Sequence, residues 1–349
     1  MTSDLKREYA RELYECNQMN RISSEATAIR ERINGKLVWY NQNIHLEPSN
    51  VCRHRCAFCS FRREKDSDPG AWSMTLEEIR DFCKENFKSS MTEIHITGSV
   101  HPERDLDYYI SIVKTVRDVL PARVAVKAYS AVEIDDMSLS SGKSAEEVLR
   151  MLRDAGLSAL PGGGAEIFDP DIRRKIAPDK CSGERWLEIH KTAHKLGIRS
   201  NCTMLFGHIE TRDQRVDHLI KLKNLQNETG GFDALIPLLF KNSGNSLSYI
   251  KELSLIEILK TFAVSRVVLD NISHIKSYWP MLGKEITALT LLYGADDIDG
   301  TINDSTKIFS LAGSCERNPS MSREELISIA TESGYKAVER DSFYNIVNN

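Results

Sequence analysis

Short apolar segments and longer amphipathic segments alternate along most of the chain. The short segments are rich in Ile, Val and Leu, and the longer ones repeat their apolar residues every three or four positions. The first pattern indicates buried strands, and the second indicates helices with one face on a core. Eight extended segments are predicted: Ile44–Asn50, Glu93–Ser99, Arg123–Ile134, Leu157–Phe168, Ile198–Phe206, Phe232–Phe240, Asn271–Trp279 and Ala295–Gly300.

A helix is predicted directly after seven of these eight extended segments. Two of the helices begin with a capping box, in which Thr75 pairs with Glu78 and Ser144 pairs with Glu147. Strict alternation of strand and helix predicts a parallel sheet, and eight such units close into a TIM-type (β/α)8 barrel. The predicted helices are Thr75–Phe87, Leu106–Leu120, Ser144–Ala155, Ser182–Leu196, Arg212–Glu228, one or two within Ser248–Leu269, and Met281–Tyr293.

Helical segments are expected on both sides of this barrel. Residues 1–43 begin with a charged, helix-favouring stretch and are predicted to form an N-terminal extension. The barrel itself is predicted over 44–310, followed over 311–349 by a segment with one helix, Ser322–Ser333, and a polar tail. A chain of 349 residues has room for this arrangement, because a barrel of this type takes about 250.

The composition argues against several classes of protein. The net charge is −4 and the basic residues form no stripe with interleaved aromatics, so we expect no binding to nucleic acid. No apolar run approaches the roughly 20 residues that span a bilayer, and the N-terminus carries no apolar signal region. Five scattered cysteines fit reduced thiols and hence a cytoplasmic protein; they are Cys16, Cys83, Cys181, Cys202 and Cys315.

The other three cysteines form a cluster directly after the first extended segment. Cys52, Cys56 and Cys59 have the spacing CxxxCxxC in a short basic run. Iron–sulfur clusters are held by cysteine thiolates, usually four of them, so three leave one iron of a [4Fe-4S] cluster without a protein ligand. An open position on a metal centre is where a small molecule can bind and react.

Two other interpretations of the cysteine cluster are weaker. A structural zinc site needs a second ligand pair, and no such pair follows at close range. A disulfide would leave an odd cysteine and requires an oxidising compartment. We therefore favour the iron–sulfur cluster.

The spacing, together with Phe58 before the last cysteine, resembles the motif of the radical S-adenosylmethionine (SAM) superfamily. This resemblance implies that SAM chelates the open iron through its amino and carboxylate groups. It also implies that one electron from the cluster cleaves SAM to methionine and a 5′-deoxyadenosyl radical. The electron would come from a donor such as flavodoxin or ferredoxin.

Unusual stretches also follow the other extended segments. The active sites of such barrels lie at the carboxyl ends of the strands. The cysteine loop and these stretches are therefore expected to form one site. They are Thr97–Pro102, Tyr129–Glu133, Pro161–Glu166, Gly207–Glu210 and His274–Tyr278.

A closer resemblance covers nearly the whole chain and points to the aminofutalosine synthase family. The resembling stretches are Leu160–Phe168, Thr203–Thr211, Glu228–Phe232, His274–Trp279 and Gly294–Gly300. Dehypoxanthine futalosine cyclase and the deazaflavin (FO) synthase subunits share versions of the first two stretches. Phe168, His274–Trp279 and Ala295–Gly300 favour the synthase.

This resemblance implies a step in menaquinone biosynthesis. The adenosyl radical would add to the methylene carbon of 3-[(1-carboxyvinyl)oxy]benzoate, an aromatic enol ether. Attack on the ring, cleavage of the C–O bond and loss of the enolpyruvyl carboxylate would give 6-amino-6-deoxyfutalosine. The alternatives are a hydrogen-abstracting relative, such as the cyclase or an FO synthase subunit, and a non-catalytic iron–sulfur electron carrier.

Seven residues are expected to contact SAM. The stretch after the second extended segment normally binds the methionine amino group, but this chain has Thr-Gly-Ser where the superfamily usually has Gly-Gly-Glu or Gly-Gly-x. Glycines elsewhere would let backbone approach the ligand, and a carboxylate would bond its ribose or amino group. The residues are Phe58, Thr97, Gly98, Ser99, Gly163, Gly164 and Glu166.

Candidates for catalysis and substrate binding carry two interpretations each. His208, Glu210 and His101 are candidate catalytic residues, and a histidine satisfied within the core is the alternative. The basic residues of the predicted strands are candidate anchors for the two substrate carboxylates, because a buried cation needs an anionic partner. A structural Asp or Glu would satisfy each of them equally well. They are Lys127, Arg199 and Lys276.

Overall fold

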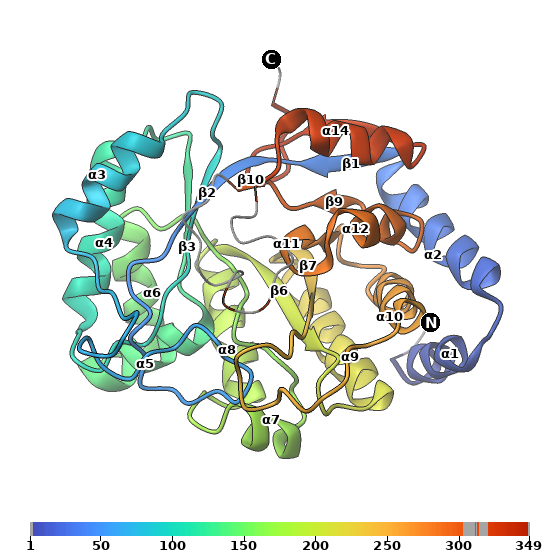
Figure 1. Ribbon diagram of the computed structural model, residues 1–349, viewed down its shortest axis with the longest axis horizontal. Helices are drawn as coiled ribbons and strands as arrows, with labels where there is room; N and C mark the ends of the chain where they lie inside the picture. The colour runs from blue at the N-terminus through green and yellow to red at the C-terminus, as the bar shows by residue number, and fades with distance from the viewer. Residues whose placement is uncertain (1–2, 303–310, 312, 314–319, 348–349) are drawn as a thin grey trace.

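A parallel sheet curves into a nearly closed barrel in the computed structural model of the protein, which describes residues 3–302, 311, 313 and 320–347 (Figure 1). Within these residues the sheet has 11 strands in the order β10-β2-β3-β4-β5-β6-β7-β8-β9-β1-β11. The strands are β1 (Leu37–Tyr40), β2 (Gln42–Leu46), β3 (Glu93–Ile96), β4 (Ala125–Ala128), β5 (Ala159–Leu160), β6 (Arg199–Phe206), β7 (Phe232–Leu239), β8 (His274–Ser277), β9 (Asp297–Ile298), β10 (Thr301–Ile302) and β11 (Lys336–Glu339).

The predicted barrel is confirmed, because each of the eight expected extended segments overlaps one strand, from β2 to β9. Neighbouring strands pair in parallel around the ring. The ring closes where Thr301 and Ile302 of β10 pair with Gln42 and Asn43 of β2. Strands β1, β10 and β11 were not predicted, since none of them is part of a strand–helix repeat.

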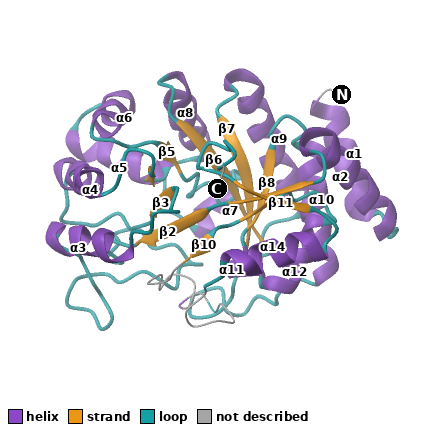
Figure 2. Cartoon of the chain, turned by 90° about the horizontal axis from the view of Figure 1, so that it is seen from above, coloured by secondary structure: helices purple, strands orange, loops and turns teal. Residues whose placement is uncertain are grey.

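The helices surround the sheet (Figure 2). The capping boxes at Thr75 and Ser144 are both confirmed. The two N-terminal helices, α1 and α2, pack against α10, so the chain carries helices outside the barrel as expected. The division at residues 43 and 310 stays a prediction. The helices are α1 (Ser3–Glu15), α2 (Met19–Asn34), α3 (Leu76–Asn86), α4 (Leu106–Val119), α5 (Ala131–Ser141), α6 (Ala145–Asp154), α7 (Pro170–Ile176), α8 (Gly183–Lys195), α9 (Arg212–Thr229), α10 (Leu255–Val268), α11 (Trp279–Leu282), α12 (Lys284–Leu291) and α14 (Arg323–Glu332).

Two extended segments are much shorter than predicted. The segment predicted over Arg123–Ile134 ends at Ala128, and α5 begins at Ala131 behind a capping box formed by Ser130 and Glu133. The second, predicted over Leu157–Phe168, contains only the two residues of β5 and is followed by the unpredicted helix α7, whose first residue is Pro170. In both places a capping signal starts a helix that the run of apolar residues concealed.

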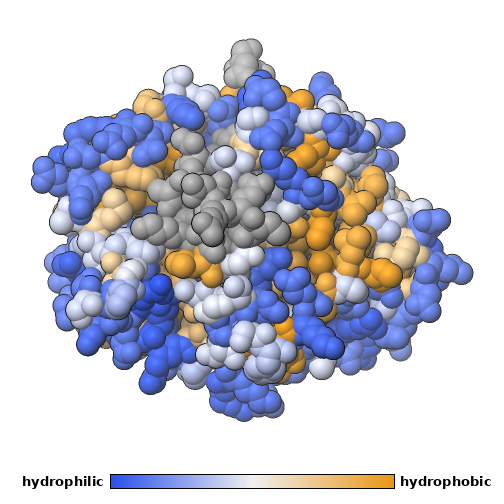
Figure 3. Space-filling model, viewed as in Figure 1, coloured by the Kyte–Doolittle hydropathy of each residue, from blue (hydrophilic) through white to orange (hydrophobic). Residues whose placement is uncertain are grey.

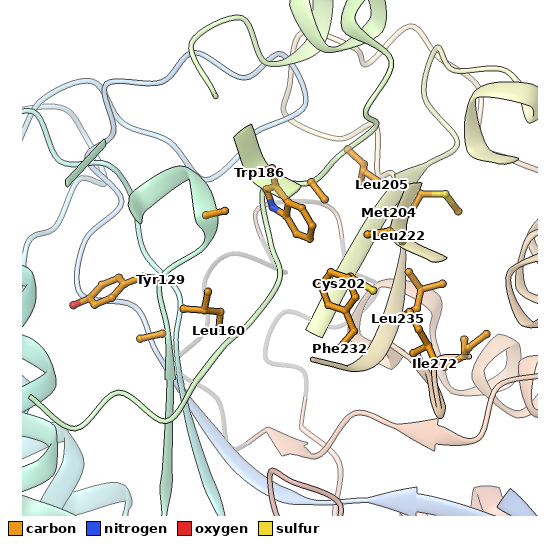
Figure 4. Close-up of a cluster of buried hydrophobic side chains, with 14 of the residues drawn as sticks. Tyr129, Leu160, Trp186, Cys202, Met204, Leu205, Leu222, Phe232, Leu235 and Ile272 are labelled. Carbon is orange, nitrogen blue, oxygen red and sulfur yellow. The ribbon is translucent and has the colours of Figure 1, made fainter. Parts of the chain in front are cut away.

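Apolar side chains fill the space between the sheet and the helices. Figure 4 shows Trp186 of α8 close to the strands that carry Cys202 and Phe232. The Trp186 ring lies 5.3 Å from the ring of Phe168, and its Nε1 donates to the carbonyl of Gly163 at 2.9 Å. Each buried side chain of this size contributes about 1.5–3 kcal/mol to stability. This packing also holds the backbone that follows β5.

The chain end predicted as a polar tail instead covers the amino-terminal end of the barrel. After β11, Arg340 Nη2 lies 2.7 Å from Asp297 Oδ2, and the Ser342 hydroxyl donates to Glu93 at 2.5 Å. The ring of Tyr344 stacks on His274 with 3.6 Å between centroids. Glu93, His274 and Asp297 are the first residues of β3, β8 and β9. The C-terminal segment therefore closes the end of the barrel opposite to the cysteines.

In the view of Figure 1, hydrophilic residues gather along the outline of the molecule and hydrophobic ones nearer its middle (Figure 3). Among the residues that the structure describes, no helix has the length and apolar character needed to cross a bilayer.

Arg340→Met is expected to lower the free energy of unfolding by about 3–5 kcal/mol, because it leaves the buried Asp297 carboxylate without its cation. Arg150→Met removes an exposed pair with Glu146 and should cost less than about 1 kcal/mol. Urea unfolding of the two variants measures the difference. Equal losses would mean that the buried pair contributes no more than a surface pair.

Candidate active site

The cysteine cluster lies in a loop that is fixed by backbone hydrogen bonds. The loop follows β2, and the Cys52 amide donates to the carbonyl of Arg63 at 2.9 Å. The Arg62 guanidinium donates in turn to the carbonyl of Cys52 at 2.8 Å, and the Ala57 amide donates to Ile176 at the end of α7. The three thiols are partly buried and free of disulfides.

All three cysteines line one cavity of about 350 Å³ at the carboxyl ends of the strands. The cavity is large enough for a small-molecule ligand. Its other walls come from the ends of β3, β4, β5, β6 and β7 and from the start of α11. The predicted convergence of strand-end stretches on the cysteine loop is therefore observed for several of them, although not for all.

The three thiols suit a polynuclear cluster better than a single metal ion. Within the described part of the chain, no group of three His, Cys, Asp or Glu side chains is arranged to hold one ion. In a four-iron cluster each cysteine binds a different iron, so the sulfurs need not converge on one point. Burial raises the pKa of the Cys56 thiol to about 12, so a metal would have to stabilise the thiolate form.

The Thr-Gly-Ser stretch after β3 forms the next part of the cavity wall. Thr97, Gly98 and Ser99 all line the cavity. The Ser99 hydroxyl donates to the carbonyl of Val51 at 2.6 Å, so it ties the end of β3 to the cysteine loop. A Cβ at Gly98 would be in ordinary contact with its surroundings, 3.8 Å from Pro48 and 3.9 Å from Glu133 Oε1.

The three glycines after β5 have different roles. Gly162 has φ +82°, and a Cβ there would lie 2.2 Å from the carbonyl oxygen of Asn201, so only glycine fits. Gly164 also has a positive φ, and a Cβ would lie 2.6 Å from Val132. Gly163 has no such contact. Gly163 and Gly164 line the cavity, as expected of backbone that approaches a ligand.

Glu166 is the anionic centre of this wall. It adopts a left-handed backbone conformation, with φ +47°, and is buried in the cavity lining. Lys180 Nζ lies 2.6 Å from Glu166 Oε1 and 5.3 Å from the centroid of the Phe58 ring. Burial alone would lower the pKa of Lys180, but its interactions with the thiolate form of Cys56 and with the Glu166 carboxylate raise it.

Lys180, Glu133 and His95 also line the cavity, although none of them was named as a candidate site residue; Glu133 falls within the expected stretch Tyr129–Glu133. Glu133 accepts from the Ser130 amide at 2.7 Å, and its burial raises the pKa of the carboxyl group. Burial and the neighbouring His45 lower the pKa of His95 to about 3, so this imidazole is neutral. The capping-box pattern of Ser130 and Glu133 could have pointed to Glu133 from the sequence. No local sequence pattern distinguishes Lys180 from a surface lysine.

The basic residues that were expected to anchor substrate lie outside the cavity lining and have carboxylate partners. Lys127 lies 2.8 Å from Glu93, and Lys276 lies 2.9 Å from Asp299, both inside the barrel. Arg199 begins β6, so it lies at the opposite end of the barrel, where its side chain is 45% exposed and pairs with Asp233. These contacts fit the alternative, in which a structural carboxylate satisfies each cation.

The three candidate catalytic residues also lie outside the lining of this cavity. His208 Nδ1 lies 3.0 Å from Glu210 Oε2, and Glu210 also accepts from Arg215 at 2.7 Å. His101 Nε2 lies 3.4 Å from Asp66, and its Nδ1 accepts from the Glu103 amide. Each side chain has a charged neighbour within the fold, so the contacts favour support of the loops over contact with a ligand.

The geometry agrees with two matches to known families. The sequence profile of the Radical SAM superfamily matches residues 46–222, which include the cysteines, the Thr-Gly-Ser stretch and Glu166. The chain belongs to the radical SAM superfamily. The profile of the CofH/MqnC C-terminal region matches residues 229–349 of this radical SAM enzyme.

Known relatives place this radical SAM enzyme in the family of aminodeoxyfutalosine synthase and related proteins. It is 41% identical to aminodeoxyfutalosine synthase of Thermus thermophilus, over 96% of this chain and 90% of that protein. It is 35% identical to the 5-amino-6-(D-ribitylamino)uracil–L-tyrosine 4-hydroxyphenyl transferase of Archaeoglobus fulgidus, over 92% of each chain. Among solved structures, methylornithine synthase has the same fold, with a TM-score of 0.72 over 95% of this chain and 93% of that one, at 17% identity.

Membership confirms two expectations from the sequence. The protein is an enzyme, and a [4Fe-4S] cluster and SAM are the cofactors of its superfamily. A non-catalytic electron carrier is thereby set aside. Cys52, Cys56 and Cys59 would hold the cluster, and the cavity beside them would receive SAM.

Replacing any one of the three clustered cysteines by alanine is expected to abolish the cluster and turnover, because each thiolate would hold a separate iron. Cys83→Ala should keep both, because Cys83 is buried in α3 away from the cavity. Iron analysis and the visible spectrum of anaerobically reconstituted protein measure the result. Close to four irons per chain in Cys52→Ala would contradict the assignment.

Glu166→Gln is expected to weaken SAM binding by tenfold or more, since it removes the charge of a buried carboxylate in the cavity wall. Ligand at a hundredfold excess over its dissociation constant stabilises the wild type by about 2.7 kcal/mol, so the variant would retain about 1.4 kcal/mol at the same concentration. Unfolding with and without SAM measures this. Glu188→Gln on the exposed face of α8 is the control, and an unchanged shift in Glu166→Gln would make Glu166 structural.

Proposed function

We propose that this enzyme is an aminodeoxyfutalosine synthase that adds the 5′-deoxyadenosyl group of SAM to 3-[(1-carboxyvinyl)oxy]benzoate and forms 6-amino-6-deoxyfutalosine. The observation that carries the proposal is the single cavity shared by the cysteine loop, Thr97–Ser99 and Gly163–Glu166. The 41% identity to a named synthase over nearly the whole chain supports this choice of reaction.

The residues of the cavity suit the separate parts of the reactants. The bound cluster supplies the one electron that cleaves SAM. Thr97, Gly98 and Ser99 would bind the methionine part of SAM through backbone and hydroxyl groups, and Gly163, Gly164 and Glu166 would bind the ribose or the amino group. Phe58 closes one side of the cavity, beside Lys180.

The walls beyond these residues are mainly apolar. Leu205, Ile236, Leu238 and Phe240 come from β6, β7 and the residue after β7, and Tyr278 follows β8. Such walls suit an aromatic ring, and they exclude water and polar hydrogen donors from reactive radicals. Proximity matters as well, because the carbon that carries the radical must lie about 3–3.5 Å from its next partner.

The proposed reaction balances without an added oxidant. A C–C bond forms between the adenosyl carbon and the methylene carbon, and the ring then moves from oxygen to the adjacent carbon as the C–O bond breaks. The enolpyruvyl carboxylate leaves as carbon dioxide together with one electron. The electron that starts the reaction is thus recovered, and methionine is the second product of SAM.

The first electron must come from outside the chain. A flavodoxin or ferredoxin in the cytoplasm suits this role, because either protein carries single electrons at low potential.

Adenosyl-labelled SAM and the enol ether are expected to give a labelled nucleoside joined to benzoate, with one carboxyl group lost. The reason is that an adding enzyme keeps the adenosyl carbon, whereas a hydrogen-abstracting enzyme releases it as 5′-deoxyadenosine. Anaerobic turnover followed by mass spectrometry measures the product. Equimolar 5′-deoxyadenosine with a cyclised or dehydrogenated substrate would replace this proposal by the cyclase or a related activity.

A further inference from the structure

The cationic residues of the cavity differ in whether their charge is neutralised. Among the residues that the structure describes, three lysine or arginine side chains belong to its lining: Arg62, Lys180 and Lys241. Lys180 is paired with Glu166, and Arg62 donates to the Cys52 carbonyl. In the part of the chain that the structure describes, the Lys241 ammonium has no carboxylate within 4.0 Å. Lys241 is therefore a cation with donors to spare for a ligand.

Lys241 is partly buried in the loop that follows β7, and this loop is fixed at both ends. The Phe240 amide donates to the Phe206 carbonyl at 2.8 Å, and the Asn245 side chain donates to the Lys241 carbonyl at 2.8 Å. Further along, the Ser246 amide donates to Ala57 in the cysteine loop at 2.9 Å. The Lys241 backbone is thus held against both β6 and the cysteine loop, at the wall of the cavity that Lys241 lines.

The surroundings of Lys241 make an anionic partner favourable. Its neighbours in the sequence, Leu238 and Phe240, line the same cavity, as do Tyr278 and Met281. A partly desolvated ammonium beside apolar walls loses hydration, and an anion with hydrogen-bond acceptors compensates for that loss. The buried cations Lys127 and Lys276 already have such partners inside the barrel.

We propose that Lys241 binds one carboxylate of the aromatic enol ether and thereby sets the position of the substrate over the cysteine loop. This inference rests on the proposed function, because that substrate carries two carboxylates. The lysine provides a charge-assisted hydrogen bond, and the apolar side chains beside it contact the ring. Lys241 thus takes the role that the sequence suggested for Lys127, Arg199 and Lys276.

The test compares Lys241→Met with Lys251→Met, which removes an exposed lysine ahead of α10 that does not line the cavity. Binding of the enol ether to anaerobic, SAM-loaded enzyme is measured by equilibrium dialysis, and KM is measured in turnover. Lys241→Met is expected to weaken binding and raise KM by at least about tenfold, with Lys241→Arg largely restoring both. Lys251→Met should leave both unchanged, and all variants should keep four irons and the SAM-induced change in the cluster spectrum.

Two analogues then identify the contact. One is 2-phenoxyacrylate, which lacks the ring carboxylate, and the other is 3-(vinyloxy)benzoate, which lacks the enol-ether carboxylate. For one of the two, wild type and Lys241→Met should bind equally, because the carboxylate that Lys241 contacts is missing. Equal losses for both analogues would show a structural role and overturn the proposal.

The outcomes separate this inference from the proposed function. If the wild type converts the enol ether and Lys241→Met binds it normally, the role of Lys241 is wrong and the function stands. If the wild type binds the enol ether without converting it, the proposed reaction fails, while the binding comparison still decides on Lys241. If the wild type does not bind the enol ether at all, both proposals fail.

Discussion

The barrel closes around Gly300, which lies between β9 and β10 where backbone from the two edges of the ring comes closest. Strand β9 pairs with β8, whereas β10, two residues later, pairs with β2 at the other edge of the sheet. A Cβ at Gly300 would lie 2.4 Å from the Asn41 carbonyl oxygen and 2.5 Å from the Asn43 side chain. Only a residue without a side chain allows this approach. Closure brings the carboxyl ends of the strands into one ring, where the cavity forms.

Charged side chains inside the barrel are paired with one another, so they are not available to a ligand. Glu93 accepts from both Lys127 and Ser342, and Lys276 pairs with Asp299. Burial alone would raise the pKa of Glu93, but Lys127 and the other cations around it lower it, so the carboxylate is ionised. Leaving any of these groups unpaired would cost several kcal/mol. The interior of the barrel therefore supports the site without contributing cations to it.

Two residues with strained backbone lie at or next to the cavity wall. Tyr129 and Glu166, the two described non-glycine residues with positive φ outside the C-terminal segment, follow neighbouring strands β4 and β5. Tyr129 directly precedes Ser130, whose amide donates a hydrogen bond to the cavity-lining Glu133. Glu166 itself lines the cavity. Strained backbone of this kind persists where surrounding contacts hold it, commonly at functional sites. Of these two carboxylates, Glu166 is thus held at an unusual backbone position, whereas Glu133 lies in the first turn of the regular helix α5.

Local signals in the sequence determined the class of fold and predicted the three thiols that would hold the cluster. Alternating strand and helix patterns predict a parallel barrel because each pattern depends on burial within a few residues, and CxxxCxxC places three thiols in one loop. Long-range contacts decided the rest. Lys127 is not free for a ligand because it pairs with Glu93, which is 34 residues away in the sequence. Lys241 is free because no carboxylate of the described residues lies near it. The segment that covers the barrel end opposite to the cysteines reads as a polar tail, because its partners Glu93, His274 and Asp297 become neighbours only when the sheet closes.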